Sequence, residues 1–325
     1  MKMYESTTSK SLKDYCNDYI AFKRSSGVKA DKEERILLRF VSYVEKWEPG
    51  VFTITKESAT KWENLSPDET QSNQIHRKSA VDRFAKYLID HGISAYIYPR
   101  YKHAPSSFTP HVFSNKELAR LFDACDNTLT PNLVRSDVVS LIFRVIYSCG
   151  MRVSEAINLT VSDVDLVQGV IHVREAKFDK ERLLPVHDEL LIRMKAYVKK
   201  IHAFSGKDAP FFPSPRRERY TPGSIYSMFR ERLWAAKISH GGKGNGPRVH
   251  DLRHTFAVHC LRRAVLRGDD LSITLKYLSV YMGHSSINAT QTYLRLTADM
   301  YPDIVCKMEK NFDVLPDMEV LNETF

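Results

Sequence analysis

Four short segments combine polar residue types that a packed apolar core would not select. They read CGMRVSE (149–155), REAKFDKERL (174–183), HDLRHTF (250–256) and MGHSSINATQTY (282–293). Arginine binds anionic groups through paired planar donors, and a tyrosine hydroxyl becomes a nucleophile when its proton is removed. The segments therefore indicate chemistry on an anionic substrate, although each one alone also fits a structural role.

Arg152 directly follows the end of an apolar helix, which places its guanidinium near the domain interior. A buried arginine is costly unless it is paired. Either Glu155, three residues further on, or an anionic ligand must therefore satisfy it. For Arg152 alone, pairing with Glu155 is the favoured interpretation.

The HDLRH segment has the spacing of the HExxH zinc site, with His250 and His254 four residues apart. Asp251, in the glutamate position, is too short to hold the catalytic water well, and Arg253 would place a cation beside the metal. No third ligand follows at a familiar spacing, so we expect no metal site. Instead His250 and Arg253, at i and i+3, share a helical face and reach a common anion. Capping and core packing are the structural explanation for the same residues.

Length and composition set the class of protein. The chain has 325 residues, 43% of them hydrophobic, which is enough for two domains. Its five cysteines form no CxxC pair, so neither a disulfide framework nor a zinc ribbon is indicated. The most apolar run, VVSLIFRVIY, is too short for a bilayer and contains Arg144, and the N-terminus lacks the pattern of a signal peptide. We expect a soluble, cytoplasmic protein.

The charge distribution favours a polyanionic partner. The net charge is +9, and residues 106–297 carry 28 basic and 18 acidic side chains, whereas residues 298–325 carry 2 basic and 7 acidic ones. A basic body of this kind most often binds nucleic acid. The alternative is that these charges form the solvated faces of ordinary helices.

Hydrophobic spacing predicts the elements that position the four segments. Amphipathic helices are expected at 11–25, 30–47 and 72–93, followed by a proline-containing linker at 98–114. In the second domain, Ser114 and Glu117 have the spacing of a capping box. An apolar helix should then end at Gly150, and a β-hairpin should pair 169–176 with 181–186 across the turn KFDK.

Further helices are expected from Pro222 onwards. The predicted fold is therefore mainly α with a small β-hairpin or sheet (α+β), in two domains. They comprise residues 1–105, including the linker, and residues 106–325.

Taken together and in this order, the four segments resemble the tyrosine recombinases, also called phage integrases, and especially their Xer-like bacterial members. CGMRVSEAINL is similar to the first-arginine motif, AKFDKERLLPV to the hairpin motif with its lysine, HDLRHTFA to the His-x-x-Arg box, and MGHSSINATQTY to the terminal box. The catalytic residues that this resemblance implies are Arg152, Lys177, His250, Arg253, His284 and Tyr293.

The resemblance also implies a role for each residue. Arg152 and Arg253 would clamp the non-bridging oxygens of a DNA phosphodiester, and Tyr293 would attack its phosphorus to form a 3′-phosphotyrosine link. His250 would act as general base and Lys177 as general acid toward the leaving 5′ oxygen.

Lys180 is the second choice for the general acid, and His284 would hydrogen-bond a phosphate oxygen. No ATP is needed, because the link stores the energy of the broken bond. No metal is needed either, because the arginines supply the positive charge.

The N-terminal domain resembles the core-binding domain of the family, which closes with the catalytic domain around double-stranded DNA. The family acts as a tetramer on two duplexes. Its C-terminal tail often docks on a neighbouring protomer, and Ile304, Val305 and Met308 would share one face of such a tail helix. Packing of the tail on its own domain is the alternative.

Two other functions fit the same segments. A type IB topoisomerase uses a closely related site to relax DNA as a monomer, and a DNA-binding regulator could keep the fold without the reaction. The presence of every expected catalytic residue argues against the regulator. The interval from Arg253 to His284 is longer than in Xer-like proteins, so the segment before Gly283 departs from the family pattern.

Overall fold

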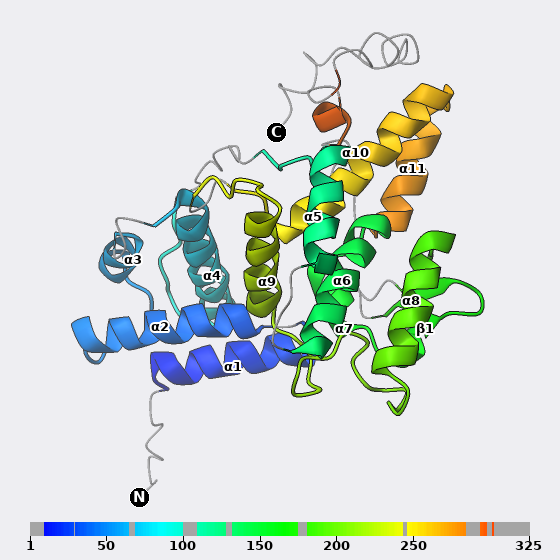
Figure 1. Cartoon of the computed structure of the whole chain (residues 1–325). Coiled ribbons are helices and arrows are strands. Elements are labelled where there is room, and N and C mark those ends of the chain that lie inside the picture. Colours follow the sequence, from blue (N-terminus) through cyan, green and yellow to red (C-terminus); the bar gives the residue numbers. More distant parts are fainter. Residues whose placement is uncertain are drawn as a thin grey trace, which may run out of the picture. The chain divides into compact units, whose positions relative to one another are not determined.

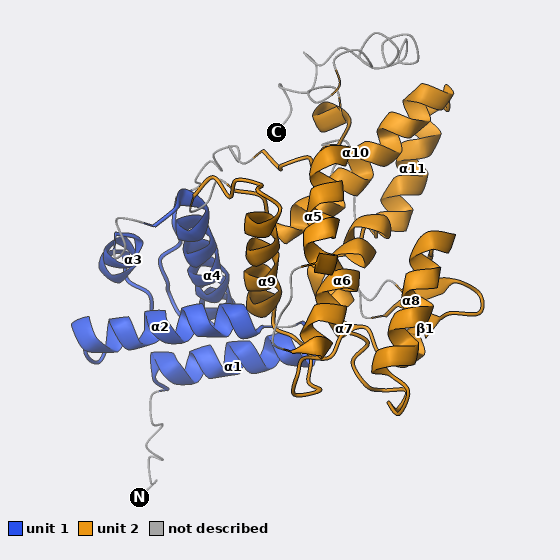
Figure 2. Cartoon of the chain, viewed as in Figure 1, with its two compact units in different colours: residues 1–108 blue, residues 109–325 orange. Residues whose placement is uncertain are grey.

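The computed structural model describes residues 10–28, 30–64, 69–99, 109–127, 132–174, 181–242, 246–283, 293–297 and 301. The chain divides into two compact units, unit 1 (residues 1–108) and unit 2 (residues 109–325), shown in different colours in Figure 2. Separate hydrophobic clusters form their cores. In the part of the chain that is described, no helix has the length and apolar character required to span a bilayer.

Unit 1 is helical in its described part (Figure 1). Its helices are α1 (Leu12–Ser25), α2 (Asp31–Trp47), α3 (Lys56–Glu63) and α4 (Gln71–Asp90). The three predicted helices correspond to α1, α2 and α4, and their apolar stripes form one core, except that Phe22 is 59% exposed. The short helix α3 was not predicted, because its eight residues bury only Ala59 and Trp62 as hydrophobic side chains.

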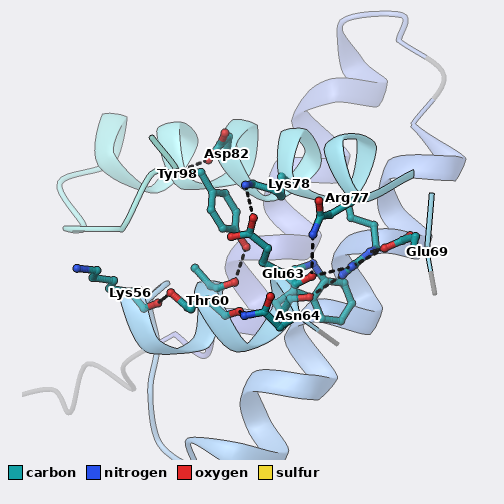
Figure 3. Close-up of polar contacts among 12 residues, drawn as sticks. Lys56, Thr60, Glu63, Asn64, Glu69, Arg77, Lys78, Asp82 and Tyr98 are labelled. Carbon is teal, nitrogen blue, oxygen red and sulfur yellow. Dashed lines mark hydrogen bonds and ion pairs between the residues drawn. The ribbon is translucent and has the colours of Figure 1, made fainter. Parts of the chain in front are cut away.

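A polar network joins α4 to α3 (Figure 3). Arg77 is buried; it donates to the Trp62 carbonyl at the end of α3 (2.8 Å) and pairs with Glu69, with Nε 2.7 Å from Oε2. Lys78 Nζ lies 2.7 Å from Glu63 Oε1 and 4.7 Å from the centre of the Tyr98 ring. These buried cations are satisfied by two carboxylates, a main-chain carbonyl and a ring face, so they fix α3 against α4.

The described part of unit 2 is mainly helical (Figure 1). Its α-helices are α5 (Asn115–Asn127), α6 (Leu133–Ser148), α7 (Val153–Asn158), α8 (Asp188–Ile201), α9 (Pro222–Ala235), α10 (Val249–Arg267) and α11 (Leu271–Met282). The predicted capping box is present at α5, where Ser114 N donates to Glu117 Oε2 at 2.8 Å and Glu117 N donates to Ser114 Oγ at 3.2 Å. The predicted apolar helix is α6, which lies in the core of this unit.

A small antiparallel sheet contains the predicted hairpin. Its strands β1 (Val164–Asp165), β2 (Val170–Val173) and β3 (Arg182–Pro185) lie in that order, and β2 pairs with β3 from Val170 opposite Pro185 to Val173 opposite Arg182. The turn between β2 and β3 lies outside the described residues. The two-residue strand β1 was not predicted, since it is too short to show alternation. The prediction of a mainly α fold with a small β-sheet is confirmed.

Helix α10 belongs to two hydrophobic cores. Val249 and Leu252 pack into the main core of unit 2, whereas Val258 and Leu261 pack with α11 and with the helical segment 293–297. Figure 1 shows α10 and α11 side by side. Because α10 is held on two sides, the polar residues near its N-terminus have fixed positions.

Candidate active site

The turn after α6 needs a glycine at position 150. Gly150 has φ +57°, and a Cβ atom there would lie 2.5 Å from Cδ1 of Phe256 on α10. Only glycine combines this backbone conformation with such a close approach. The turn brings the Gly150 carbonyl to α10, where it accepts a hydrogen bond from Arg253.

Arg152 caps α7 and pairs with Glu155, as predicted. Its Nη1 lies 2.7 Å from Glu155 Oε1, its backbone N donates to Oε2 at 2.8 Å, and its Nη2 donates to the Gly283 carbonyl at 2.8 Å. The side chain is still 23% exposed. Arg152 is therefore oriented by protein groups and open to solvent on one side.

Glu155 has a second partner, Arg182 on β3, which was not predicted. Arg182 Nη2 lies 2.8 Å from Glu155 Oε2, and its Nε donates to the Tyr281 carbonyl at 2.9 Å. Burial alone would raise the pKa of Glu155, but the hydrogen bonds and charge of Arg182, and then the hydrogen bonds of Arg152, hold it below its ordinary value. One sequence feature could have indicated that Arg182 is paired. Arg182 shares its strand face with the buried Leu184, and a charged residue on a buried face needs a partner.

Arg253 is 1% exposed and is held by main-chain carbonyls. Its Nη1 donates to Gly150 O and its Nη2 to Met282 O, both at 2.7 Å. Burial, and then the charge of Arg152, lower the pKa of its guanidinium to about 10, so it remains protonated at pH 7. Arg152 and Arg253 therefore converge on consecutive carbonyls at the C-terminus of α11.

Tyr293 lies in the same place, with 3% of its surface exposed. Its Oη is 3.2 Å from His254 Nδ1. Burial raises the pKa of the Tyr293 phenol, while the charge and hydrogen bonding of Arg253 and the charge of Arg152 oppose that shift. The phenol is therefore protonated at neutral pH, and the charges of both guanidiniums act on its pKa.

His250 lies one helical turn before His254, and its residue is exposed. The two rings are in edge contact, with centroids 4.7 Å apart. Desolvation by the surrounding protein, and then the charges of Arg253 and Arg152, lower the pKa of His250 to about 4. Solvent reaches the ring and moderates this desolvation, but the direction of the shift makes the imidazole neutral at pH 7.

Asp251 and Thr255 fix the N-terminal part of α10. Asp251 Oδ2 accepts from Arg248 N at 2.8 Å as the N-terminal cap. Thr255 Oγ1 accepts from Phe113 N at 3.0 Å and donates to the Asp251 carbonyl at 2.7 Å. The carboxylate that would act in a zinc site of the HExxH type is thus used for capping. Among the described residues, no three histidine, cysteine, aspartate or glutamate side chains are placed to hold a metal ion.

The structure brings together four of the six predicted catalytic residues, namely Arg152, His250, Arg253 and Tyr293. Lys177, its alternative Lys180, and His284 lie outside the described residues. Their roles remain predictions.

Comparison with known proteins identifies relatives of the chain. Residues 111–300 match the phage integrase family. Two putative integrase/recombinases come from Sinorhizobium fredii (strain NBRC 101917 / NGR234). One, y4rE, is 30% identical over 87% of this chain and 91% of its own length. The other, y4rB, is 27% identical over 91% of this chain and 96% of its own length. The tyrosine recombinase XerD of Pseudomonas aeruginosa is 32% identical over 49% of this chain and 50% of its own length.

Solved structures share the fold. The XerH site-specific recombinase bound to a palindromic difH substrate has a TM-score of 0.67 at 17% identity, covering 95% of this chain and all of that one. A lambda integrase dimer bound to a COC′ core site has a TM-score of 0.59 at 20% identity, covering 87% of this chain and 95% of that one. With residues 111–300 matched and relatives aligned over most of its length, the chain belongs to the phage integrase family, the tyrosine recombinases.

Proposed function

We propose that the protein recombines specific DNA sites by cleaving and rejoining strands through a covalent 3′-phosphotyrosine intermediate. The observation that carries this proposal is the convergence of Arg152 and Arg253 on one site with Tyr293. A phosphodiester is already anionic, and its transition state spreads further charge over the non-bridging oxygens. Two guanidiniums that stay charged at neutral pH are suited to stabilise that state.

In the cleavage step, Tyr293 Oη bonds to the scissile phosphorus and the bond from phosphorus to O5′ breaks. Lys177 protonates O5′, with Lys180 as the alternative, and His284 hydrogen-bonds a phosphate oxygen. The family resemblance implies that His250 is the general base for the Tyr293 hydroxyl. A 5′ hydroxyl from the second duplex then attacks the phosphotyrosine, which restores a phosphodiester and frees the tyrosine.

Double-stranded DNA is the proposed substrate of both units. Unit 1 acts as the core-binding domain and unit 2 as the catalytic domain, a division close to the boundary predicted at residue 105. The +10 net charge of residues 106–297 fits contact with phosphate backbones, and the named relatives include recombinases solved with DNA.

The active assembly is proposed to be a tetramer linked by the C-terminal tails. A groove of about 970 Å³ beside α10 and α11 is lined by Ile273, Tyr277 and Val280, which are 51%, 74% and 75% exposed. Arg263 and Arg267 also line it, and the tail (298–325) carries 2 basic and 7 acidic residues together with apolar ones. Apolar burial and charge attraction both favour docking of a neighbour's tail in this groove.

A mixing experiment tests the tail assignment. Protein lacking residues 302–325 has the groove but no tail, and a Tyr277→Asp, Val280→Asp double variant has the tail but a charged groove. Each alone should bind DNA without assembling, and their mixture should form heterodimers. Assembly of the tail-deleted protein by itself would show that the tail does not link protomers.

The catalytic proposal is tested with a nicked suicide duplex, from which the short 5′ fragment diffuses away and traps the covalent complex. Its sequence is first selected by capturing genomic fragments that the protein binds. We expect wild-type protein to form a denaturant-stable complex and Tyr293→Phe to form none. A cross-link with the Phe variant would eliminate Tyr293 as the nucleophile. Site-independent relaxation of plasmid DNA would favour the topoisomerase, and binding without cleavage would favour the regulator.

A further inference from the structure

A second histidine of α10 contacts the nucleophile. His254 Nδ1 lies 3.2 Å from Tyr293 Oη, with ring centroids 5.5 Å apart. His250, four residues earlier, is in edge contact with the His254 ring, with ring centroids 4.7 Å apart. Neither the sequence motifs nor the roles described above give His254 a part in the reaction.

The burial of Tyr293 limits the groups that can accept its hydroxyl proton. Only 3% of the residue surface is accessible, so bulk water has little access to its hydroxyl. Attack on phosphorus requires the phenol proton to leave as the new bond forms. A protein group must therefore receive it, and the imidazole of His254, a group able to accept a proton, lies at hydrogen-bond distance.

The position of His254 is fixed before substrate binds. The helix that carries it is anchored on both sides, by the Asp251 cap and by the hydrogen bond from Phe113 to Thr255, the residue after His254. Residues at i and i+4 face the same side of a helix, which explains why the His250 and His254 rings meet in an edge-to-face contact. His254 is thus held beside Tyr293, and His250 contacts the His254 ring.

We infer that His254, rather than His250, is the catalytic residue that accepts the Tyr293 proton during DNA cleavage. The inference rests on the proposed function. In the resting state the phenol donates to Nδ1 of neutral His254, which carries its own proton on Nε2. As Oη bonds to phosphorus, the phenol proton moves to Nδ1, the bond from phosphorus to O5′ breaks, and O5′ receives a proton from Lys177.

Rejoining reverses these transfers. The attacking 5′ hydroxyl gives up its proton to Lys177 while the phenolate departs from phosphorus, and the His254 imidazolium returns a proton to it. The imidazolium would stand beside two guanidiniums, and the negative charge of the bound phosphate offsets this repulsion. The proton therefore moves only when phosphate occupies the site.

The test measures single-turnover formation of the covalent complex on the suicide duplex. His254→Asn places an amide oxygen near the position of Nδ1, so it keeps a hydrogen-bond acceptor but cannot take a proton, and His254→Ala removes both. We expect each variant to bind DNA with wild-type affinity and to cleave about 100-fold or more slowly. Cleavage by His254→Asn within threefold of the wild-type rate would overturn the inference, because acceptance of a hydrogen bond alone would then suffice.

A rescue experiment separates proton removal from positioning. A ring-fluorinated tyrosine at position 293 has a more acidic phenol, so it depends less on a base. We expect it to restore cleavage by His254→Asn at least tenfold and to change the wild-type rate little. An equal effect on both proteins would contradict the assignment. A 5′-bridging sulfur substrate, whose leaving group needs no proton, should rescue Lys177→Ala and leave His254→Asn slow.

The same helix offers a matched control. His259 Nδ1 lies 2.9 Å from Tyr147 Oη, a second histidine–tyrosine pair of α10 that has no place in the proposed reaction. His259→Asn should cleave at the wild-type rate, and a 100-fold loss there would show that damage to α10 causes the effect.

Nitrogen NMR that compares the wild-type protein with Tyr293→Phe supplies a readout that does not depend on folding of the His254 variants. The Nδ1 resonance of His254 should shift in Tyr293→Phe, and an unchanged resonance would refute the contact. If wild-type protein forms no covalent complex at all, the proposed function fails. If it forms one that His254 does not influence, this inference alone fails.

Discussion

Replacing Arg182 with methionine tests the buried pairing behind Arg152. The change removes the two hydrogen bonds to Glu155 and the one to the Tyr281 carbonyl while keeping the aliphatic stem. The side chains of Arg182 and Glu155 are 9% and 5% exposed. Loss of one partner from a buried ion pair costs about 3–5 kcal/mol. Because Arg152 still pairs with Glu155, we expect about 3 kcal/mol.

This loss should lower the midpoint of thermal unfolding, followed by circular dichroism, by about 6–12 °C for a unit of this size. Arg174→Met is the matched control on the neighbouring strand end. Arg174 pairs with Asp163 at 2.7 Å, and the two side chains are 52% and 9% exposed. Because solvent reaches the Arg174 side of the pair, its loss should cost about 1 kcal/mol. Equal midpoints for the two variants would refute the reasoning.

The effect should also depend on pH. The pKa of Glu155 is held below its ordinary value in the folded protein. The ionised carboxylate therefore stabilises the folded state fully at pH values above its unfolded pKa of about 4.3. This stabilisation is lost as the pH falls through the folded pKa. The stability difference between wild type and Arg182→Met should therefore shrink below about pH 4. A difference that stays constant down to pH 3 would mean that the charge of Glu155 is not what Arg182 stabilises.

Three further predictions concern α10 and its contacts. Gly150→Ala should lower the free energy of unfolding by about 3 kcal/mol, because the alanine Cβ would overlap the Phe256 ring and the residue has a positive φ. Adding Phe256→Leu should restore part of the lost stability. No restoration would rule out the overlap as the cause. Thr255→Val should cost about 1–3 kcal/mol in chemical denaturation, since it leaves Phe113 N unpaired; a neutral effect would mean that water replaces the hydroxyl. Burial, and then the charges of nearby arginines, lower the pKa of His259 to about 4 in the folded protein. As the pH is lowered from about 6.5 to 4, this histidine is protonated in the unfolded state but not in the folded one, so the stability of the wild-type protein should fall. In His259→Gln that fall should be smaller in thermal melts across this range, and an identical pH profile would exclude His259 as its source.

Regular, periodic patterns predicted most of the framework. Helix α6 is continuous and apolar, and the capping box of Ser114 and Glu117 is a local signal, so neither depends on distant residues. Helix α3 and strand β1 are too short for a period, and tertiary contacts decide whether they form. The pairing of Arg152 with Glu155 could be predicted because the two residues are three positions apart at a helix start.

The partners of the other site residues could not be predicted in this way. Arg182 is 27 residues from Glu155, and the contact between His254 and Tyr293 spans 39 residues. The four-residue spacing of His250 and His254 was visible, but it indicated only a shared helix face and is also the spacing of a zinc site. Whether such a face meets a metal, a phosphate or a tyrosine depends on which segment folds against it.

The end of α11 explains how the site tolerates two adjacent cations. The last carbonyls of a helix have no partner within it and form the negative end of its dipole. Here Arg253 donates to Met282 O and Arg152 to Gly283 O, so the guanidiniums cap α11 while the helix end offsets their charge. Each bond uses one of the two hydrogens on its Nη atom. Under the proposed function, the remaining hydrogens would be donors oriented for a phosphate before it binds. Because these acceptors are backbone atoms, no residue type in the sequence could reveal them, although they hold both arginines beside Tyr293.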